Sequence, residues 1–118
     1  MSYVDGFLVP VRHDQRAAYV EVATAAAQIF RDLGALAVVE CWGDDIPDGK
    51  VTDFRRAVAA EADETVVFSW IVWPSREIRD AGNARMMADN PMKDMAMPFD
   101  GKRMVFGGFA TIVDTAAD

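Results

Sequence analysis

The chain has 118 residues, a length that suits one domain built around a single hydrophobic core. Its 52% hydrophobic and 26% charged residues are typical of a folded soluble protein and exclude an intrinsically disordered one. The net charge of −7, from 12 basic and 19 acidic residues, argues against nucleic-acid binding, which depends on Lys and Arg neutralising phosphates. We therefore expect one domain over residues 1–118 and no nucleic-acid partner.

The apolar segments and the cysteine content bear on location. No apolar run approaches the roughly 20 residues that span a bilayer, and the N-terminus lacks the basic and apolar regions of a secretion signal. The single cysteine, Cys41, excludes an internal disulfide and a Cys-based zinc site. We expect a cytoplasmic protein without a membrane partner, a bound metal or a cofactor.

The first half of the chain alternates strand and helix patterns. Residues 3–11 (YVDGFLVPV) predict a strand that is apolar on both faces. Apolar residues recur at helical spacing over residues 15–33, with Asp14 as the expected N-cap and Gly34 just past the end. Residues 35–42 (ALAVVECW) predict a second strand.

The second half repeats the alternation. Residues 51–60 are ambiguous, with a short helical turn favoured over a strand, and residues 65–73 (TVVFSWIVW) predict a strand from their β-branched and aromatic content. Ser75 is the expected cap of a helix over residues 76–88, which Asn90 and Pro91 end. A last strand is predicted over residues 104–113, followed by a loose tail over residues 114–118.

The order of these elements indicates the fold class. The sequence β-α-β-β-α-β predicts a ferredoxin-like α+β fold, in which both helices pack on one face of an antiparallel sheet. The other face is apolar as well, because residues such as Leu8, Phe68 and Phe109 alternate with apolar neighbours on the helix side. Since a monomer rarely exposes so large an apolar patch, we expect a homodimer in which two sheets face each other.

Four segments carry a family resemblance: YVDGFLVPV, VVECWGDDIPDGKVTDFRRAV, DETVVFSWIVWPS and MPFDGKRMVFGGF. Together they resemble the YbaA-like family of small bacterial proteins of unknown function. The resemblance implies the dimeric α+β barrel architecture. The wider superfamily includes quinone-forming monooxygenases, haem-degrading oxygenases, lactone isomerases and proteins without known activity, so the resemblance implies no single reaction.

Two carboxylates interrupt apolar strands, where an unpaired charge is costly to bury. Asp5 shares a face with Phe7, and Glu40 shares a face with Trp42. If both point into a cavity, they are candidate catalytic bases with a raised pKa. The alternative that we favour is that each lies near a strand end and forms an ion pair with an arginine, such as Arg55, Arg56 or Arg103.

Other side chains are candidates for ligand contact. Trp42, Trp70 and Phe68 are the candidate ligand-binding residues, as apolar walls of a pocket. Cys41 has no visible activating base, so we expect it to pack in the core. His13, the only histidine, is expected to be an exposed junction residue, and no metal site is predicted.

A methionine set could line a pocket mouth or form a lid, although core or dimer packing is the favoured interpretation. Its members are Met86, Met87, Met92, Met95, Met97 and Met104.

Three hypotheses on function remain open. The favoured one is a binding protein for a small apolar molecule, held in a barrel or sheet-helix pocket. The second is a cofactor-independent monooxygenase or isomerase acting on a quinone, polyphenol or lactone, with Asp5 or Glu40 as the base and Trp70 as a wall. The third is a structural or protein-interaction dimer without a ligand. Whether the chain is an enzyme is left undecided by the sequence.

Overall fold

The computed structural model describes residues 1–116 and consists of one antiparallel sheet and three α-helices. The six long elements follow the predicted order: β1 (Tyr3–Arg12), α1 (Arg16–Asp32), β2 (Ala37–Trp42), β3 (Glu64–Trp73), α3 (Arg76–Asp89) and β4 (Val105–Ala110). Three short helices connect them: the 3-10 turns η1 (His13–Gln15) and η2 (Gly101–Arg103), and α2 (Phe54–Ala57), which lies within the ambiguous segment 51–60. The fold is therefore of the predicted mixed α+β class.

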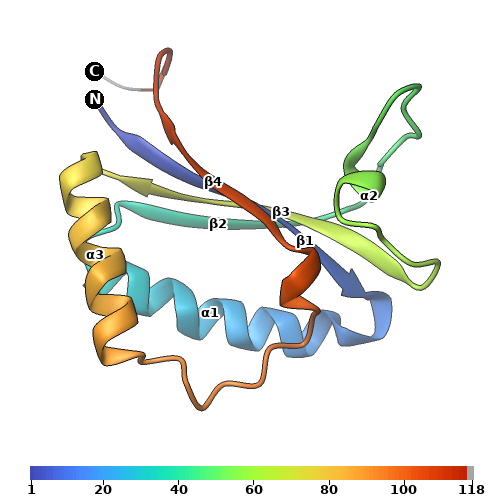
Figure 1. Cartoon of the computed structure of the whole chain (residues 1–118), viewed down its shortest axis with the longest axis horizontal. Coiled ribbons are helices and arrows are strands. Elements are labelled where there is room, and N and C mark those ends of the chain that lie inside the picture. The colour runs from blue at the N-terminus through green and yellow to red at the C-terminus, as the bar shows by residue number, and fades with distance from the viewer. Residues whose placement is uncertain (117–118) are drawn as a thin grey trace.

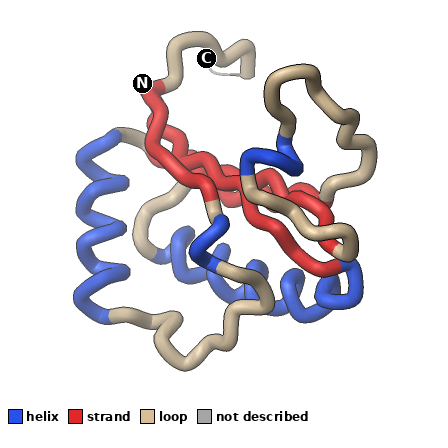
Figure 2. Tube along the Cα trace, turned by 45° about the vertical axis from the view of Figure 1, so that its right-hand side comes forward, coloured by secondary structure: helices blue, strands red, loops and turns tan. Residues whose placement is uncertain are grey.

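The four strands are hydrogen-bonded in the order β2-β3-β1-β4, and every neighbouring pair is antiparallel. Figure 1 shows α1 running beneath the sheet and α3 standing at one end of it. The turned view in Figure 2 shows the same arrangement, with both long helices on one side of the strands. The sheet thus has a helix face and an open face.

The helix termini agree closely with local sequence signals. The hydroxyl of Ser75 accepts a hydrogen bond from the backbone N–H of Ile78 at 3.2 Å, and Asn90 ends α3 in the left-handed conformation. Gly34, at φ +115°, follows the end of α1. At the start of α1 the prediction differs: η1 occupies the first turn, so Gln15 rather than Asp14 precedes the helix, and it makes no capping bond.

The helix face carries most of the core. Alternate residues of β3, from Thr65 to Trp73, are buried on this side. Trp73 has no exposed surface, packs edge-on against Phe30 of α1, and donates its indole N–H to Asp5 at 3.0 Å. α3 approaches this ring at Gly82, where a Cβ atom would lie 2.8 Å from the indole.

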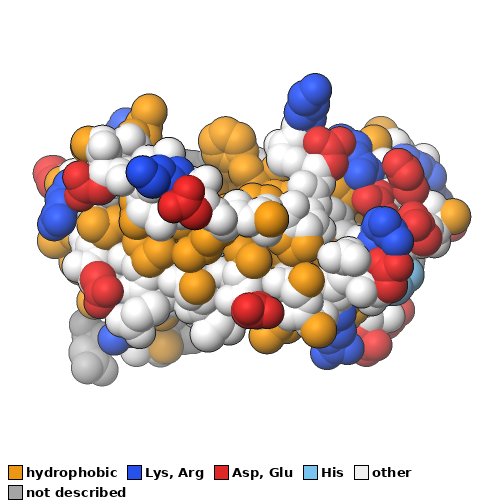
Figure 3. Space-filling model, turned by 90° about the horizontal axis from the view of Figure 1, so that it is seen from below, with side chains coloured by type: hydrophobic (Ala, Val, Ile, Leu, Met, Phe, Trp, Pro, Cys, Tyr) orange, Lys and Arg blue, Asp and Glu red, His pale blue; other side chains and the backbone are white. Residues whose placement is uncertain are grey.

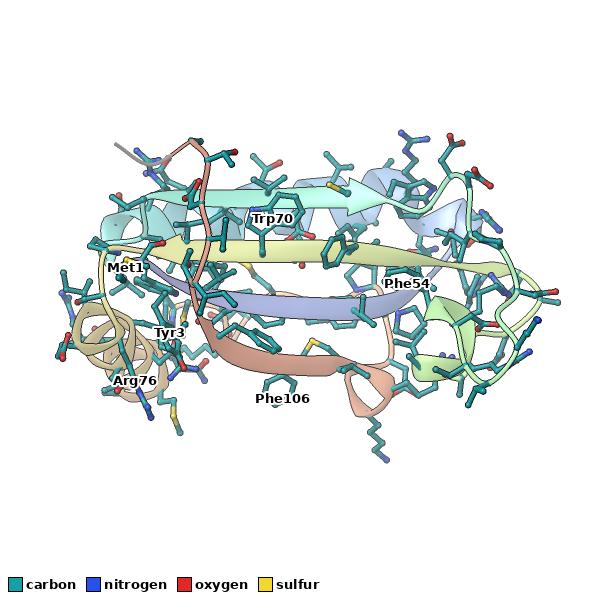
Figure 4. All side chains as sticks on the ribbon, turned by 90° about the horizontal axis from the view of Figure 1, so that it is seen from above. Met1, Tyr3, Phe54, Trp70, Arg76 and Phe106 are labelled. Carbon is teal, nitrogen blue, oxygen red and sulfur yellow. The ribbon has the colours of Figure 1, made fainter. Side chains whose placement is uncertain are left out.

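The last strand is shorter than predicted. β4 ends at Ala110 because its partner β1 begins at Tyr3, the residue that Ala110 pairs with. The chain after β4 crosses the open face at that end of the sheet (Figure 4). Residues 117–118 of the expected loose tail lie outside the described residues. Within residues 1–116 no helix is long and apolar enough to cross a membrane.

Candidate functional site

A cavity of about 360 Å³ lies between the helix face of the sheet, α1 and the segment that joins α3 to β4. Helix α1 contributes six lining residues: Tyr19, Val22, Ala23, Ala26, Ala27 and Phe30. The strands contribute Phe7, Val9, Val38, Glu40, Ser69 and Ile71. The connecting segment contributes Met92, Met97, Phe99 and Met104.

The lining is almost entirely apolar. Figure 3, which views the helix side, shows apolar side chains gathered along the middle of this face, with charged side chains around them. The alanines of α1 leave room that larger side chains would fill, whereas the methionines are flexible enough to adapt to different shapes. The cavity is thus suited to hold an apolar molecule.

The polar groups of the cavity are gathered at one place, where α1 meets β2. The Tyr19 hydroxyl donates a hydrogen bond of 2.6 Å to Oε1 of Glu40, which joins the helix to the strand. Ser69 of β3 is the cross-strand partner of Glu40 and lines the same cavity. A bound molecule could donate a hydrogen bond to Glu40 or accept one from a hydroxyl of this group.

The environment of this pair raises both pKa values. Partial burial of the carboxyl raises the pKa of Glu40 above its usual value, although hydrogen bonding from Tyr19 and Ser69 opposes the effect. Burial also raises the pKa of the Tyr19 hydroxyl, and hydrogen bonding to Glu40 adds to this. Glu40 as a whole residue remains exposed, because β2 is an edge strand, so its carboxyl lies at the boundary between cavity and solvent.

An outer groove of about 440 Å³ adjoins the cavity at this boundary. Five residues line both spaces: Tyr19, Ala23, Ala27, Val38 and Glu40. The groove runs along α1 as far as Arg31, whose guanidinium donates to the backbone carbonyl of Leu36. Between these two links, the α1 residues that line both spaces are the small Ala23 and Ala27, so this is where a molecule could pass from solvent into the cavity.

The other candidate carboxylate, Asp5, lies elsewhere on the helix face. Its Oδ1 is 3.0 Å from Nη2 of Arg79 on α3, and its Oδ2 accepts the bond from the Trp73 indole. Asp5 is buried and has its charge matched, as the ion-pair alternative describes, but its partner is Arg79 rather than Arg55, Arg56 or Arg103. It does not line the cavity. Its contacts fix the end of α3 against β1 and β3.

The candidate aromatic residues are divided between the two faces of the sheet. Trp42 is on the helix face beside Tyr19, with ring centroids 6.5 Å apart, and Arg16 lies over its ring. Trp70 and Phe68 lie on the open face, with ring centroids 5.3 Å apart, and Phe54 of α2 packs beside Phe68 (Figure 4). Of these three candidates, only Trp42 therefore lies near the cavity. It packs against Tyr19 and does not line the cavity.

The remaining candidates lie outside the cavity. Cys41 is exposed on the open side of the edge strand, so the expectation of core packing was wrong; it faces away from both long helices. His13 is exposed in η1 at the junction before α1, as expected. Across residues 1–116, no three His, Cys, Asp or Glu side chains come together as metal ligands.

The sequence did not single out Tyr19 as a site residue. In the sequence Tyr19 belongs only to the apolar face of the helix predicted over residues 15–33, because its hydrogen bond joins residues 21 positions apart. A signal was nevertheless present: a hydroxyl-bearing side chain on the buried stripe of a helix needs a partner, and Glu40 needed one too. Three of the six methionines in the predicted set, Met92, Met97 and Met104, line the cavity.

Comparison with known families gives the chain its relatives. Residues 2–101 match the family described as "Protein of unknown function (DUF1428)". The chain belongs to this family. Two relatives, each called "Uncharacterized protein YbaA", come from Escherichia coli strain K12 and from Shigella flexneri. Each is 60% identical over 116 residues, which cover 97% of this chain and 99% of the relative. The resemblance seen in the sequence is thus confirmed. Both relatives are uncharacterised, so they indicate no function for this chain.

A solved structure supports the fold. The chain is similar to the structure of Rv0793 from Mycobacterium tuberculosis, with a TM-score of 0.54 and 14% sequence identity. The likeness covers 98% of this chain and the whole of the other. At this low identity the similarity concerns the fold alone, so the cavity and its residues have to be interpreted from this chain.

Proposed function

We propose that this protein binds a small apolar molecule in the cavity between the sheet and α1. The observation that carries the proposal is a cavity of about 360 Å³ whose lining is apolar except for Glu40, Tyr19 and Ser69. Ligand sites are mostly apolar hollows of about 300–1,000 Å³ with a few placed polar groups, and this one lies at the small end of that range. The ligand's apolar body would occupy the space under the alanines of α1, with one polar group at Glu40.

We also propose that the protein acts as a homodimer, with two ferredoxin-like sheets facing each other in an α+β barrel. The open face supports this: it is apolar, neither long helix covers it, and Phe109 is 61% and Phe68 47% exposed. The Phe109 ring lies beside Gly6 and Gly107, where an added Cβ atom would be 3.5 Å from it, an ordinary contact distance. A second copy offers the same apolar surface, so the contact would be isologous. A cytoplasmic location, inferred from the unpaired Cys41, belongs to the same proposal.

The binding proposal can be tested by filling the cavity. Ala26 lines the cavity but not the outer groove, so Ala26→Leu should occupy ligand space without closing access. Measured by titration calorimetry with 4-phenylbutan-1-ol, the affinity should fall at least about tenfold. The matched control is Ala25→Leu, at an exposed position on the same helix, and it should bind as the unaltered chain does.

Thermal unfolding of both variants shows whether each is folded. Equal affinity in the unaltered chain and in a folded Ala26→Leu variant would contradict the proposed site, as would failure of the unaltered chain to bind apolar probes.

A further inference from the structure

The carboxylates that are wholly or partly buried differ in whether they have a cationic partner. Asp5 and Glu64 are both buried, and each has an arginine partner: Arg79 for Asp5 and Arg103 for Glu64. Glu40, the acid that lines the cavity, is in no ion pair within residues 1–116. A carboxylate drawn partly out of water without a cation is destabilised, so a cation arriving beside it would be stabilised.

The arginines of α1 do not pair with Glu40. Arg16 lies over the Trp42 ring, 5.4 Å from its centroid, and Arg31 donates to the Leu36 carbonyl. The cavity lining itself contains no Lys, Arg or His. An anionic ligand would therefore meet Glu40 without any compensating positive charge.

Aromatic rings next to Glu40 add to this preference. Tyr19 has its ring centroid 5.9 Å from that of Phe99 and 6.5 Å from that of Trp42. The faces of such rings attract cations and repel anions. Glu40 also lies where the cavity meets the outer groove, so a charged head group could stay partly hydrated there while its apolar body enters the cavity.

We propose that the ligand is an apolar amine, whose ammonium group pairs with Glu40 beside Tyr19 and whose hydrocarbon or aromatic body lies among Ala26, Met97 and Phe99. This inference rests on the proposed function, because it names the class of molecule that the cavity takes. Glu40 and Tyr19 select the head group, and the alanines and methionines accommodate the body. Asp5 and Glu64 each form an ion pair with an arginine of the chain. The ammonium of the ligand would be the corresponding cation for Glu40.

Three probes of one shape test the inference: 4-phenylbutylamine, 4-phenylbutan-1-ol and 4-phenylbutanoate, which carry a positive, a neutral and a negative head group. Calorimetric titrations at pH 7.5 and low salt should show that the amine binds about tenfold more tightly than the alcohol, and the acid most weakly. In Glu40→Gln the preference for the amine over the alcohol should be lost, so that the two probes bind with equal affinity. The matched control, Glu21→Gln on the exposed side of α1, should keep the preference.

The outcomes separate the two proposals. If the alcohol binds the unaltered chain as tightly as the amine, or Glu40→Gln keeps the preference, the amine inference is wrong while the cavity remains a binding site. If none of the three probes binds, the proposed function itself fails.

A second readout does not depend on the variant. In the unaltered chain, the amine should move the ¹³C resonance of the Glu40 carboxyl, and the alcohol should move it much less. An equal change with both probes would also overturn the inference.

Discussion

Glu40 and Asp5 show how differently two carboxylates on apolar strands can be held. Asp5 is matched by Arg79 and by the Trp73 indole, contacts that fix secondary structure elements in place. Within residues 1–116, the groups that hydrogen-bond the Glu40 carboxyl are hydroxyls, and partial burial raises its pKa. A buried acid with an arginine serves the fold, whereas an unmatched acid on a cavity wall is available to a ligand.

A first prediction concerns the cost of Glu40 to stability. A carboxyl whose pKa is raised on folding favours the folded state at low pH and loses that contribution as the pH rises through its folded pKa. Glu40→Gln, which keeps an acceptor for Tyr19, should therefore raise the free energy of unfolding at pH 7.5. The gain should vanish below the ordinary glutamate pKa of 4.5, where the acid is protonated in both states.

Urea unfolding at the two pH values measures this effect, with Glu21→Gln as the exposed control. A variant that is less stable than the unaltered chain at pH 7.5 would show that Glu40 supports the fold instead.

A second prediction concerns Glu64, whose effect has the opposite sign. Arg103 donates to both of its carboxylate oxygens, at 2.6 and 2.8 Å, and lowers the pKa of Glu64 to about 2. Its contribution to stability is present above its ordinary pKa of 4.5 and is lost as the pH falls towards 2. Glu64→Gln should lower the free energy of unfolding at pH 7 by about 1–3 kcal/mol and flatten its fall in acid. Unchanged acid dependence in the variant would refute this role.

At the scale of the elements, local signals predicted the helices better than the strands. Helix α3 begins after Ser75 and ends before Asn90, almost as predicted, because capping depends on neighbouring residues. The extent of β4 was overestimated, because a strand ends where its partner ends, and Tyr3 of β1 is far from Ala110 in the sequence. Residues 51–60, which contain the short α2, have no clear periodicity, so the sequence does not predict this helix firmly.

A third prediction tests the contact between α3 and the sheet. Alanine normally stabilises a helix relative to glycine by about 1 kcal/mol, but at Gly82 the new Cβ would lie 2.8–2.9 Å from the buried Trp73 ring. Gly82→Ala should therefore destabilise the protein by about 1–3 kcal/mol, measured by urea unfolding. Gly101→Ala, where no atom lies within 4 Å of the new Cβ, is the control and should change stability by no more than about 0.5 kcal/mol. A stabilising Gly82→Ala would contradict the tight packing.

At the scale of the whole molecule, the apolar alternation predicted a two-faced sheet, but not which residues meet on the helix side. Trp42 and Glu40 could be placed on one face from the strand period alone. That Tyr19 would bond Glu40, or that Arg79 would reach Asp5 across 74 positions, depends on how α1 and α3 lie on the sheet. Cavities depend on the same arrangement, so the ligand site could be predicted as a type but not assigned to its residues.

A fourth prediction concerns assembly. Sedimentation equilibrium of the unaltered chain should give twice the chain mass of 13.0 kDa. Phe109→Glu places a charge on the open face and should yield a monomer, because an unpaired charge is costly to bury in an apolar interface. The control, Met87→Glu, alters a methionine of α3 that is 84% exposed and should remain dimeric. A monomeric unaltered chain would refute the proposed dimer.

The central claim is that the cavity under α1 is a ligand site, and methionine methyl groups can report on it directly. We would label the methionines with ¹³C and titrate the unaltered chain with 4-phenylbutylamine. The account predicts that the methyl signals of Met92, Met97 and Met104, which line the cavity, shift together and saturate, while those of the exposed Met1 and Met87 stay in place. Shifts confined to Met1 and Met87, or none up to millimolar probe, would contradict the claim.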